Sequence, residues 1–142
     1  MIIYKSFTFD SAHFLPNVPP HHKCRNIHGH TYHLTVYFEG EVTTPEGWVL
    51  DFALIKNAVK PIVDQLDHTI LNEVPGLENP TAENLARYLL EEICPTLLKP
   101  MNVRAIKVVV WERGEACCEA STAESADDRS SLARGHGSVS LP

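Results

Sequence analysis

The feature that most restricts the fold of this chain is the alternation of apolar and polar residues at positions 28–39. After two histidines, the even positions of this segment are apolar and the odd positions are mostly polar. Side chains of a strand project alternately to its two faces, so the pattern predicts a strand with one buried and one solvated face. Such a strand is typical of an antiparallel sheet that is covered on one side. The apolar positions are Tyr32, Leu34, Val36 and Phe38.

The two histidines begin the apolar face of this strand. His28 and His30 are two residues apart, so they project the same way, and Gly29 leaves the opposite face empty between them. A His-x-His pair on a strand is usually just two solvated polar residues. On a buried face the rings need partners, because burying unpaired polar groups is costly. A metal ion is one such partner, and His13 can supply a third imidazole.

A cysteine precedes this pair by four residues. Three neutral imidazoles with an open fourth position form a known catalytic zinc set. Cys24 can therefore be a fourth ligand, which would close the site, or a reactive thiol beside an open one. His21 and His22 are rival donors, but they lie in a proline-flanked loop and we expect them to be solvated. The residues alone leave both roles of Cys24 open.

Three further segments predict strands. Residues 2–9 are rich in β-branched and aromatic side chains, and residues 103–112 contain a run of valines. Residues 115–120 predict a short fourth strand. A loop at residues 16–24, with two adjacent prolines inside it, separates the first strand from the second.

Two amphipathic segments predict helices between the second and third strands. Asp51 and Thr81 are suited to be N-caps, and each precedes an apolar stripe at helical spacing. Pro61 lies inside the first stripe and predicts a kink or break. The order ββααββ predicts an α+β fold, a four-stranded antiparallel sheet with two helices on one face. We interpret the second stripe as core: Leu85, Ala86, Leu89, Leu90, Ile93 and Leu97.

Composition restricts the classes of function. The net charge of −6 argues against nucleic acid or an anionic membrane as the main partner. No secretory signal or membrane span is evident, and four cysteines without framework spacing predict free thiols in a reducing cytoplasm. We divide the chain into one domain, residues 1–120, and a polar tail, residues 121–142. We expect the tail to be disordered, because it has too little apolar surface to bury.

Two acidic features have a structural and a functional interpretation. Asp67 precedes His68 at the end of the first helix, and a histidine oriented by a carboxylate is a standard proton-transfer unit. An Asp-His pair at the C-terminus of a helix is nevertheless more often a cap or a surface ion pair. Glu112 ends the third strand on its apolar face, on the side of Ile106, Val108 and Val110. It can form a structural ion pair or accept hydrogen bonds from the N–H edge of a ligand.

Seven segments in fixed order show a family resemblance. They are Phe7-Thr8-Phe9-Asp10-Ser11-Ala12-His13, Cys24, His28-Gly29-His30-Thr31-Tyr32, Val49-Leu50-Asp51-Phe52, Leu66-Asp67-His68, Asn79-Pro80-Thr81-Ala82-Glu83-Asn84 and Trp111-Glu112. Over about residues 1–120 the chain resembles the 6-pyruvoyltetrahydropterin synthase superfamily. Within it, the chain is most similar to the bacterial branch of 6-carboxy-5,6,7,8-tetrahydropterin synthases of queuosine biosynthesis.

The resemblance implies a role for each candidate residue. Cys24 would be a proton-transferring thiol, assisted by the pair Asp67 and His68. Glu112 would bind the guanidine-like edge of a pterin, with Thr81 and Glu83 lining the pocket, partly from a neighbouring subunit. The zinc ligands would be His13, His28 and His30.

The resemblance also implies an assembly and a reaction. The family has the tunnelling fold, whose subunits form oligomeric barrels, so we expect a homo-oligomer built from trimers, a hexamer. We expect a zinc-dependent lyase that converts 7,8-dihydroneopterin triphosphate to 6-carboxy-5,6,7,8-tetrahydropterin, acetaldehyde and triphosphate. One alternative is a 6-pyruvoyltetrahydropterin synthase, which stops after elimination of triphosphate and internal redox transfer. The other is a non-catalytic zinc module in which Cys24 joins the three histidines.

The end of the chain departs from the family pattern. Members of the family usually carry an aromatic residue in the last strand and end soon after it. This chain has Cys117-Cys118-Glu119-Ala120 there, followed by the polar tail. The departure leaves the pairing of the fourth strand open but touches no proposed site residue.

Overall fold

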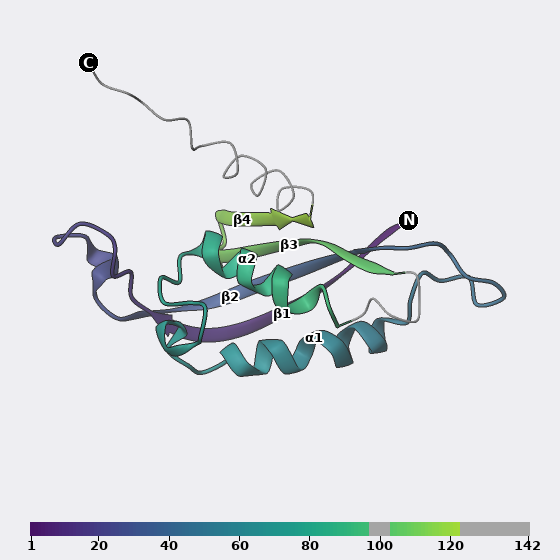
Figure 1. The fold of residues 1–142 in the computed structure, drawn as a ribbon, viewed down its shortest axis with the longest axis horizontal. Coiled ribbons are helices and arrows are strands. Elements are labelled where there is room, and N and C mark those ends of the chain that lie inside the picture. Colours follow the sequence, from purple (N-terminus) through teal and green to yellow (C-terminus); the bar gives the residue numbers. More distant parts are fainter. Residues whose placement is uncertain (97–102, 123–142) are drawn as a thin grey trace, which may run out of the picture.

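Four strands and two helices form a two-layer α+β structure in the computed structural model, which describes residues 1–96 and 103–122. The helices α1 (Phe52–Leu66) and α2 (Ala82–Ile93) cover one face of a single antiparallel sheet (Figure 1). The predicted fold class and element order are confirmed. The strands follow one another in the sheet as they do in the chain: β1 (Ile2–His13), β2 (His28–Glu39), β3 (Arg104–Arg113) and β4 (Ala116–Ser121).

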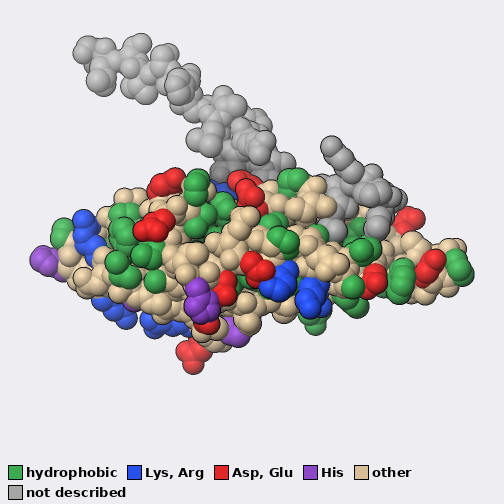
Figure 2. Space-filling model, turned by 90° about the horizontal axis from the view of Figure 1, so that it is seen from below, with side chains coloured by type: hydrophobic (Ala, Val, Ile, Leu, Met, Phe, Trp, Pro, Cys, Tyr) green, Lys and Arg blue, Asp and Glu red, His purple; other side chains and the backbone are tan. Residues whose placement is uncertain are grey.

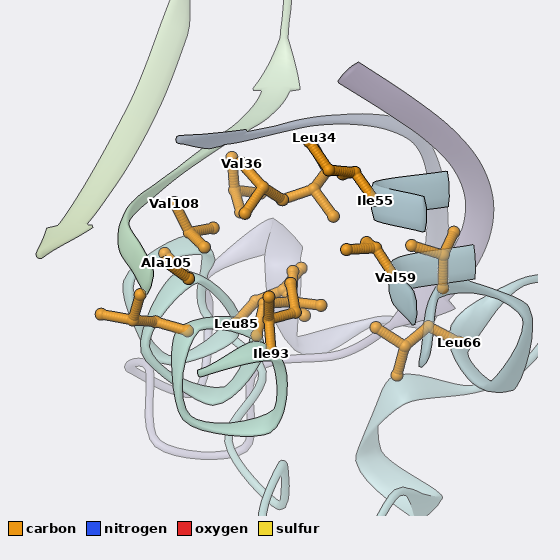
Figure 3. Close-up of a cluster of buried hydrophobic side chains, with 14 of the residues drawn as sticks. Leu34, Val36, Ile55, Val59, Leu66, Leu85, Ile93, Ala105 and Val108 are labelled. Carbon is orange, nitrogen blue, oxygen red and sulfur yellow. The ribbon is translucent and has the colours of Figure 1, made fainter. Parts of the chain in front are cut away.

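The alternation in β2 decides which face the helices cover. Its four apolar even positions are all fully buried, as the pattern predicts. Figure 3 shows side chains from β2, β3, α1 and α2 pointing toward one another between the layers. Burial of these groups is the main favourable contribution to folding. The labelled members are Leu34, Val36, Ile55, Val59, Leu66, Leu85, Ile93, Ala105 and Val108.

Both helices begin at the predicted caps. The Asp51 carboxylate accepts a hydrogen bond from the Ala53 N–H at 2.8 Å, and the Thr81 hydroxyl accepts one from the Asn84 N–H at 3.2 Å. These bonds satisfy backbone donors that have no partner inside the helix. Thr81 is consequently fixed at the start of α2, close to the end of β3 and the start of β4.

The break expected at Pro61 is wrong, since α1 continues through this residue. Proline cannot donate to the carbonyl four residues earlier, which belongs to Asn57. Both Pro61 and Asn57 are exposed. Water can therefore hydrate the carbonyl of Asn57, and the helix can tolerate the lost bond on its outer side.

The strands differ from expectation at their ends. β1 runs to His13, four residues beyond the predicted end, because it pairs with the first residues of β2. β4 pairs with β3 in antiparallel register despite its two cysteines, with Cys118 opposite Val110. Leu97 and residues 123–142, which include most of the predicted tail, lie outside the described residues.

Two long connections extend beyond opposite ends of the sheet. One joins β1 to β2 and carries Cys24, and the other leads from β2 to α1 (Figure 1). Acidic, basic and apolar side chains are interspersed over the face shown in Figure 2. All four cysteines are free thiols, as predicted. Within the described residues, neither helix has the length and apolar character needed to cross a membrane.

Candidate active site

The pairing of β1 with β2 brings three imidazoles together on the helix-covered face. His13 lies directly opposite His28, and His30 lies opposite Ser11. The ring centroids of the three histidines are 4.6, 4.9 and 5.1 Å apart. Each ring offers one nitrogen, and these nitrogens lie within 4.8 Å of one another. One ion between the rings could therefore be reached by all three.

Backbone carbonyls fix the tautomers of two rings. The Nδ1 of His13 lies 2.8 Å from the carbonyl oxygen of Pro80. The Nδ1 of His28 lies 2.7 Å from the carbonyl oxygen of Asn26. A carbonyl can only accept, so each Nδ1 carries the proton and each neutral ring presents a lone pair at Nε2. These two Nε2 atoms are only 3.0 Å apart, and a cation is the partner that both lone pairs can share.

The third ring supports the same conclusion. Nε2 of His30 is buried and makes no hydrogen bond among the described residues. Oε1 of Glu112 lies 3.2 Å from this nitrogen, but the two atoms do not have the geometry of a hydrogen bond. Burial lowers the pKa of both His13 and His30, which keeps the rings in the neutral, metal-binding form. Three neutral imidazoles converging on one point suit zinc.

Cys24 lies on a braced turn in the connection between β1 and β2. It belongs to the short 3₁₀ turn Lys23–Arg25 and is half-buried. Its N–H donates to Nδ1 of His22 at 3.2 Å, and its carbonyl accepts from the Leu15 N–H at 2.8 Å. Its sulfur is not part of the set of ligand atoms that lie within 4.8 Å of one another. This arrangement favours a thiol beside an open site over a fourth ligand.

The three candidate pocket residues line one hollow. Thr81, Glu83 and Glu112 surround a space of about 270 Å³, together with Leu15, Ala82, Arg113, Ala116, Cys117 and Cys118. Glu112 reaches from this hollow to His30, and Leu15 is bonded to the backbone of Cys24. The hollow therefore adjoins the histidine cluster, and the backbone of Cys24 is bonded to one residue of its wall.

The strand register explains why Glu112 faces the histidines. Val108 and Val110 of β3 pair with Val36 and Leu34, so the side chains of these four residues share the covered face. Glu112 follows two residues later, at a second register shift between Trp111 and Arg113, and its carboxylate lies 3.2 Å from His30. Ile106 does not belong to the same alternation, because the register shifts by one residue at a bulge there.

Asp67 and His68 form the expected pair, but they lie at a different hollow from Glu112. Nδ1 of His68 lies 2.9 Å from Oδ2 of Asp67. The Asp67 carboxylate raises the pKa of His68, and its own pKa is lowered first by the hydrogen bond from the Asp10 N–H and then by His68. His68 has a left-handed backbone, with φ of 57°, and its side chain is 77% exposed. It can exchange protons with a group that approaches from outside.

The surroundings of His68 separate it from the thiol of its own chain. It lines a hollow beside Asp10, Thr31 and Glu73 at the edge of β1. Asp10 and Thr31 are joined by a 2.5 Å hydrogen bond on the exposed face of the sheet. His30 also lines this hollow, whereas Cys24 and His13 do not. The structure thus brings together His13, His28, His30, Thr81, Glu83 and Glu112, and it places the pair Asp67 and His68 at a second hollow, which His30 also lines.

Sequence reasoning missed several groups at the site. The carbonyls of Pro80 and Asn26 orient the rings, and no residue pattern reveals a backbone acceptor. Cys118 lines the hollow beside Glu83. The only signal for it was the unusual cysteine pair in the last strand.

Comparison with known proteins identifies the family. The model of a family described as 6-pyruvoyl tetrahydropterin synthase matches residues 2–123. The chain therefore belongs to the 6-pyruvoyl tetrahydropterin synthase family. The predicted family and the prediction of an enzyme are both confirmed.

Relatives and structures within this family carry different names. A 6-carboxy-5,6,7,8-tetrahydropterin synthase of Synechocystis is 39% identical over 99 residues, 65% of this chain and 74% of that protein. A dihydroneopterin monophosphate aldolase of Pyrococcus furiosus is 37% identical over 114 residues, 80% of this chain and 90% of that protein. The structure of a Caenorhabditis elegans 6-pyruvoyl tetrahydropterin synthase superposes with a TM-score of 0.76 at 26% identity, covering 85% of this chain and 94% of that one.

Proposed function

We propose that this protein is a zinc-dependent lyase of the cytoplasm acting in queuosine biosynthesis. Its substrate is 7,8-dihydroneopterin triphosphate, and its products are 6-carboxy-5,6,7,8-tetrahydropterin, acetaldehyde and triphosphate. The observation that carries the proposal is the convergence of three imidazoles beside a hollow that contains a carboxylate. The name of the Synechocystis relative supports this product over the alternatives.

Each group near the hollow has a chemical task in this proposal. His13, His28 and His30 would hold a zinc ion, which would supply Lewis-acid chemistry for the oxygens of the substrate side chain. Cys24 moves protons to and from the carbons of that side chain. Glu112 accepts two parallel hydrogen bonds from the N–H edge of the pterin, which orients the side chain toward the thiol.

Asp67 and His68 take part through a neighbouring copy of the chain. The pair lies apart from its own Cys24, and His68 is exposed to an approaching partner. The hollow that it lines contains the carboxylates of Asp10 and Glu73, whereas Cys24 lies between the exposed cations Lys23 and Arg25. This charge complementarity supports docking of the thiol loop of one subunit at the His68 hollow of the next. The active enzyme is accordingly a homo-oligomer, and we propose a hexamer.

A second candidate function is an aldolase acting on dihydroneopterin monophosphate. It is favoured by the relative of that name in Pyrococcus furiosus, which covers more of this chain than the Synechocystis protein does. Aldol cleavage would break the bond between the first two side-chain carbons and leave a hydroxymethyl group on the pterin. The pyruvoyl-forming reaction is a third outcome on the same site, since it needs the same metal and thiol.

Product analysis separates these reactions. Purified protein is incubated in parallel with the triphosphate and the monophosphate of 7,8-dihydroneopterin, and all products are identified by mass spectrometry. We expect 6-carboxytetrahydropterin and acetaldehyde from the triphosphate. A hydroxymethyl pterin from the monophosphate would establish the aldolase instead, and a pyruvoyl pterin without acetaldehyde would establish the pyruvoyl synthase.

Glu112→Gln is expected to lower kcat/KM by a factor that corresponds to a loss of roughly 2–4 kcal/mol of transition-state stabilisation. Glutamine keeps the shape but turns one acceptor into a donor, so an N–H of the pterin would face another N–H where water is scarce. Zinc content should stay the same, because Glu112 is not one of the three converging ligands. Steady-state kinetics and metal analysis measure both effects. Unaltered affinity for 7,8-dihydroneopterin would place the pterin elsewhere.

A further inference from the structure

The first residue after β1 is held by a side chain from far along the chain. β1 ends at His13, so Phe14 lies beyond its pairing with β2. The Phe14 N–H donates to Oδ1 of Asn72 at 3.0 Å, and the Phe14 carbonyl accepts from Nδ2 of Asn72 at 2.8 Å. Since an N–H only donates and a carbonyl only accepts, the two contacts fix the orientation of the amide. Asn72 thus satisfies both backbone groups of Phe14, as a residue of a neighbouring strand would.

Asn72 stands on a segment that is itself fixed to the body of the protein. It is the middle residue of the 3₁₀ turn η2 (Leu71–Glu73), and the side chain of Leu71 is fully buried in the core. Two residues before η2, the Thr69 carbonyl accepts a hydrogen bond from the Ala12 N–H of β1 at 3.0 Å. The turn is therefore anchored to both the core and β1, and its amide is a fixed support for the residue that follows the strand.

This contact leads directly to the thiol. Leu15 is the next residue of the chain, and its N–H donates to the carbonyl of Cys24 at 2.8 Å. The guanidinium of Arg25 donates to two backbone carbonyls of the opposite arm, each at 3.0 Å. These bonds join the two arms of the thiol loop, residues 14–25, to each other. The loop is braced within itself, and the amide of Asn72 fastens its first residue to η2.

We propose that Asn72 is a positioning residue for Cys24, whose side-chain amide holds the base of the thiol loop and so aligns the thiol with the substrate. The amide bonds to the backbone of Phe14 and Glu78, so it acts on the reaction through the loop. Proton transfer requires close alignment, and a displacement of about 1 Å can cost about 10²-fold in rate. The inference rests on the proposed function, because it takes Cys24 to be the proton-transferring thiol.

Asn72→Ala separates alignment from binding. We expect kcat with 7,8-dihydroneopterin triphosphate to fall about 10- to 100-fold, whereas the dissociation constant of 7,8-dihydroneopterin stays within about threefold. Zinc content should remain near one per chain, because Asn72 is not one of the three converging ligands. Thr43→Ala is a matched control, since the Thr43 hydroxyl also donates to a backbone carbonyl, that of Trp48 at 3.0 Å, in the connection between β2 and α1. Its kcat should not change.

Asn72→Asp tests the hydrogen bonds at constant side-chain size. The carboxylate can still accept from the Phe14 N–H, but it has no donor for the carbonyls of Phe14 and Glu78. In this variant too, kcat should therefore fall about tenfold or more. Two results would overturn the proposal. One is an unchanged kcat in Asn72→Ala, and the other is a full kcat in Asn72→Asp, which would show that only side-chain volume matters.

A measurement without pterin separates this inference from the proposed function. The rate at which N-ethylmaleimide labels Cys24 in the purified protein is followed by mass spectrometry. Asn72→Ala should raise this rate about fivefold or more, because a loop released at its base exposes the half-buried thiol more often. Cys94 in the same sample is the internal reference, and its rate should not change. An unchanged rate at Cys24 would refute the role of Asn72 in holding the loop, whereas absence of turnover of the triphosphate by the unmodified protein would refute the proposed function instead.

Discussion

Cys24→Ala is expected to retain zinc and bind pterin but to lose turnover by roughly 10²- to 10⁴-fold. The expectation follows from the separation of tasks at the site. The three imidazoles converge without the sulfur of Cys24, so its removal leaves the ligand set intact. The backbone of the turn is held by Leu15 and His22, and these bonds do not need the thiol.

Three measurements on this variant separate the roles of Cys24. Metal analysis tests whether Cys24 coordinates the metal. Binding of 7,8-dihydroneopterin tests whether the pocket is intact, and single-turnover kinetics with the triphosphate test the chemical step. Cys94→Ala controls for loss of a thiol as such, since Cys94 is remote from the hollow. A Cys24→Ala enzyme with near-normal kcat would exclude proton transfer by this thiol. Loss of the metal in this variant would instead favour the closed zinc module.

His28→Ala is expected to reduce bound zinc from about one per chain to a small fraction, and to abolish activity with it. Two imidazoles remain in this variant, and a set of two protein ligands is below the three that catalytic zinc sites use. The side chain of His28 is at the end of the sheet and does not belong to the hydrophobic core. The fold should therefore remain, and circular dichroism should show an unchanged secondary structure.

His33→Ala is the matched control for this metal prediction. His33 is on the same strand, but its alternation places it on the exposed face, opposite Trp111. Its removal should leave the zinc content near one per chain. If His28→Ala keeps the same zinc content and activity as His33→Ala, the metal lies elsewhere.

The sequence predicted those parts of the fold that depend on local patterns. The alternation of β2 placed Tyr32, Leu34, Val36 and Phe38 in the core, because a strand that is covered on one side allows no other register. The caps at Asp51 and Thr81 follow from side-chain chemistry alone. The prediction of a break at Pro61 was wrong, because the pattern does not show that the carbonyl left without a hydrogen bond is exposed to water.

Only those features of the site that depend on the spacing of residues within one segment could be predicted. His28 and His30 share a face by alternation, but the position of His13 depends on the register between β1 and β2. The separation of His68 from Cys24 depends on how α1 leaves the sheet edge, a tertiary property that no local pattern contains. The place of Cys118 in the wall of the hollow likewise required the pairing of β4 with β3.

The central claim is that three histidines hold an open metal site with Cys24 outside it. X-ray absorption at the zinc edge of the purified, zinc-loaded protein tests this most directly. We predict three imidazole nitrogens and one further light atom at about 2.0–2.1 Å, with no sulfur. A sulfur shell at about 2.3 Å that disappears in Cys24→Ala would contradict the account and show that the thiol closes the site.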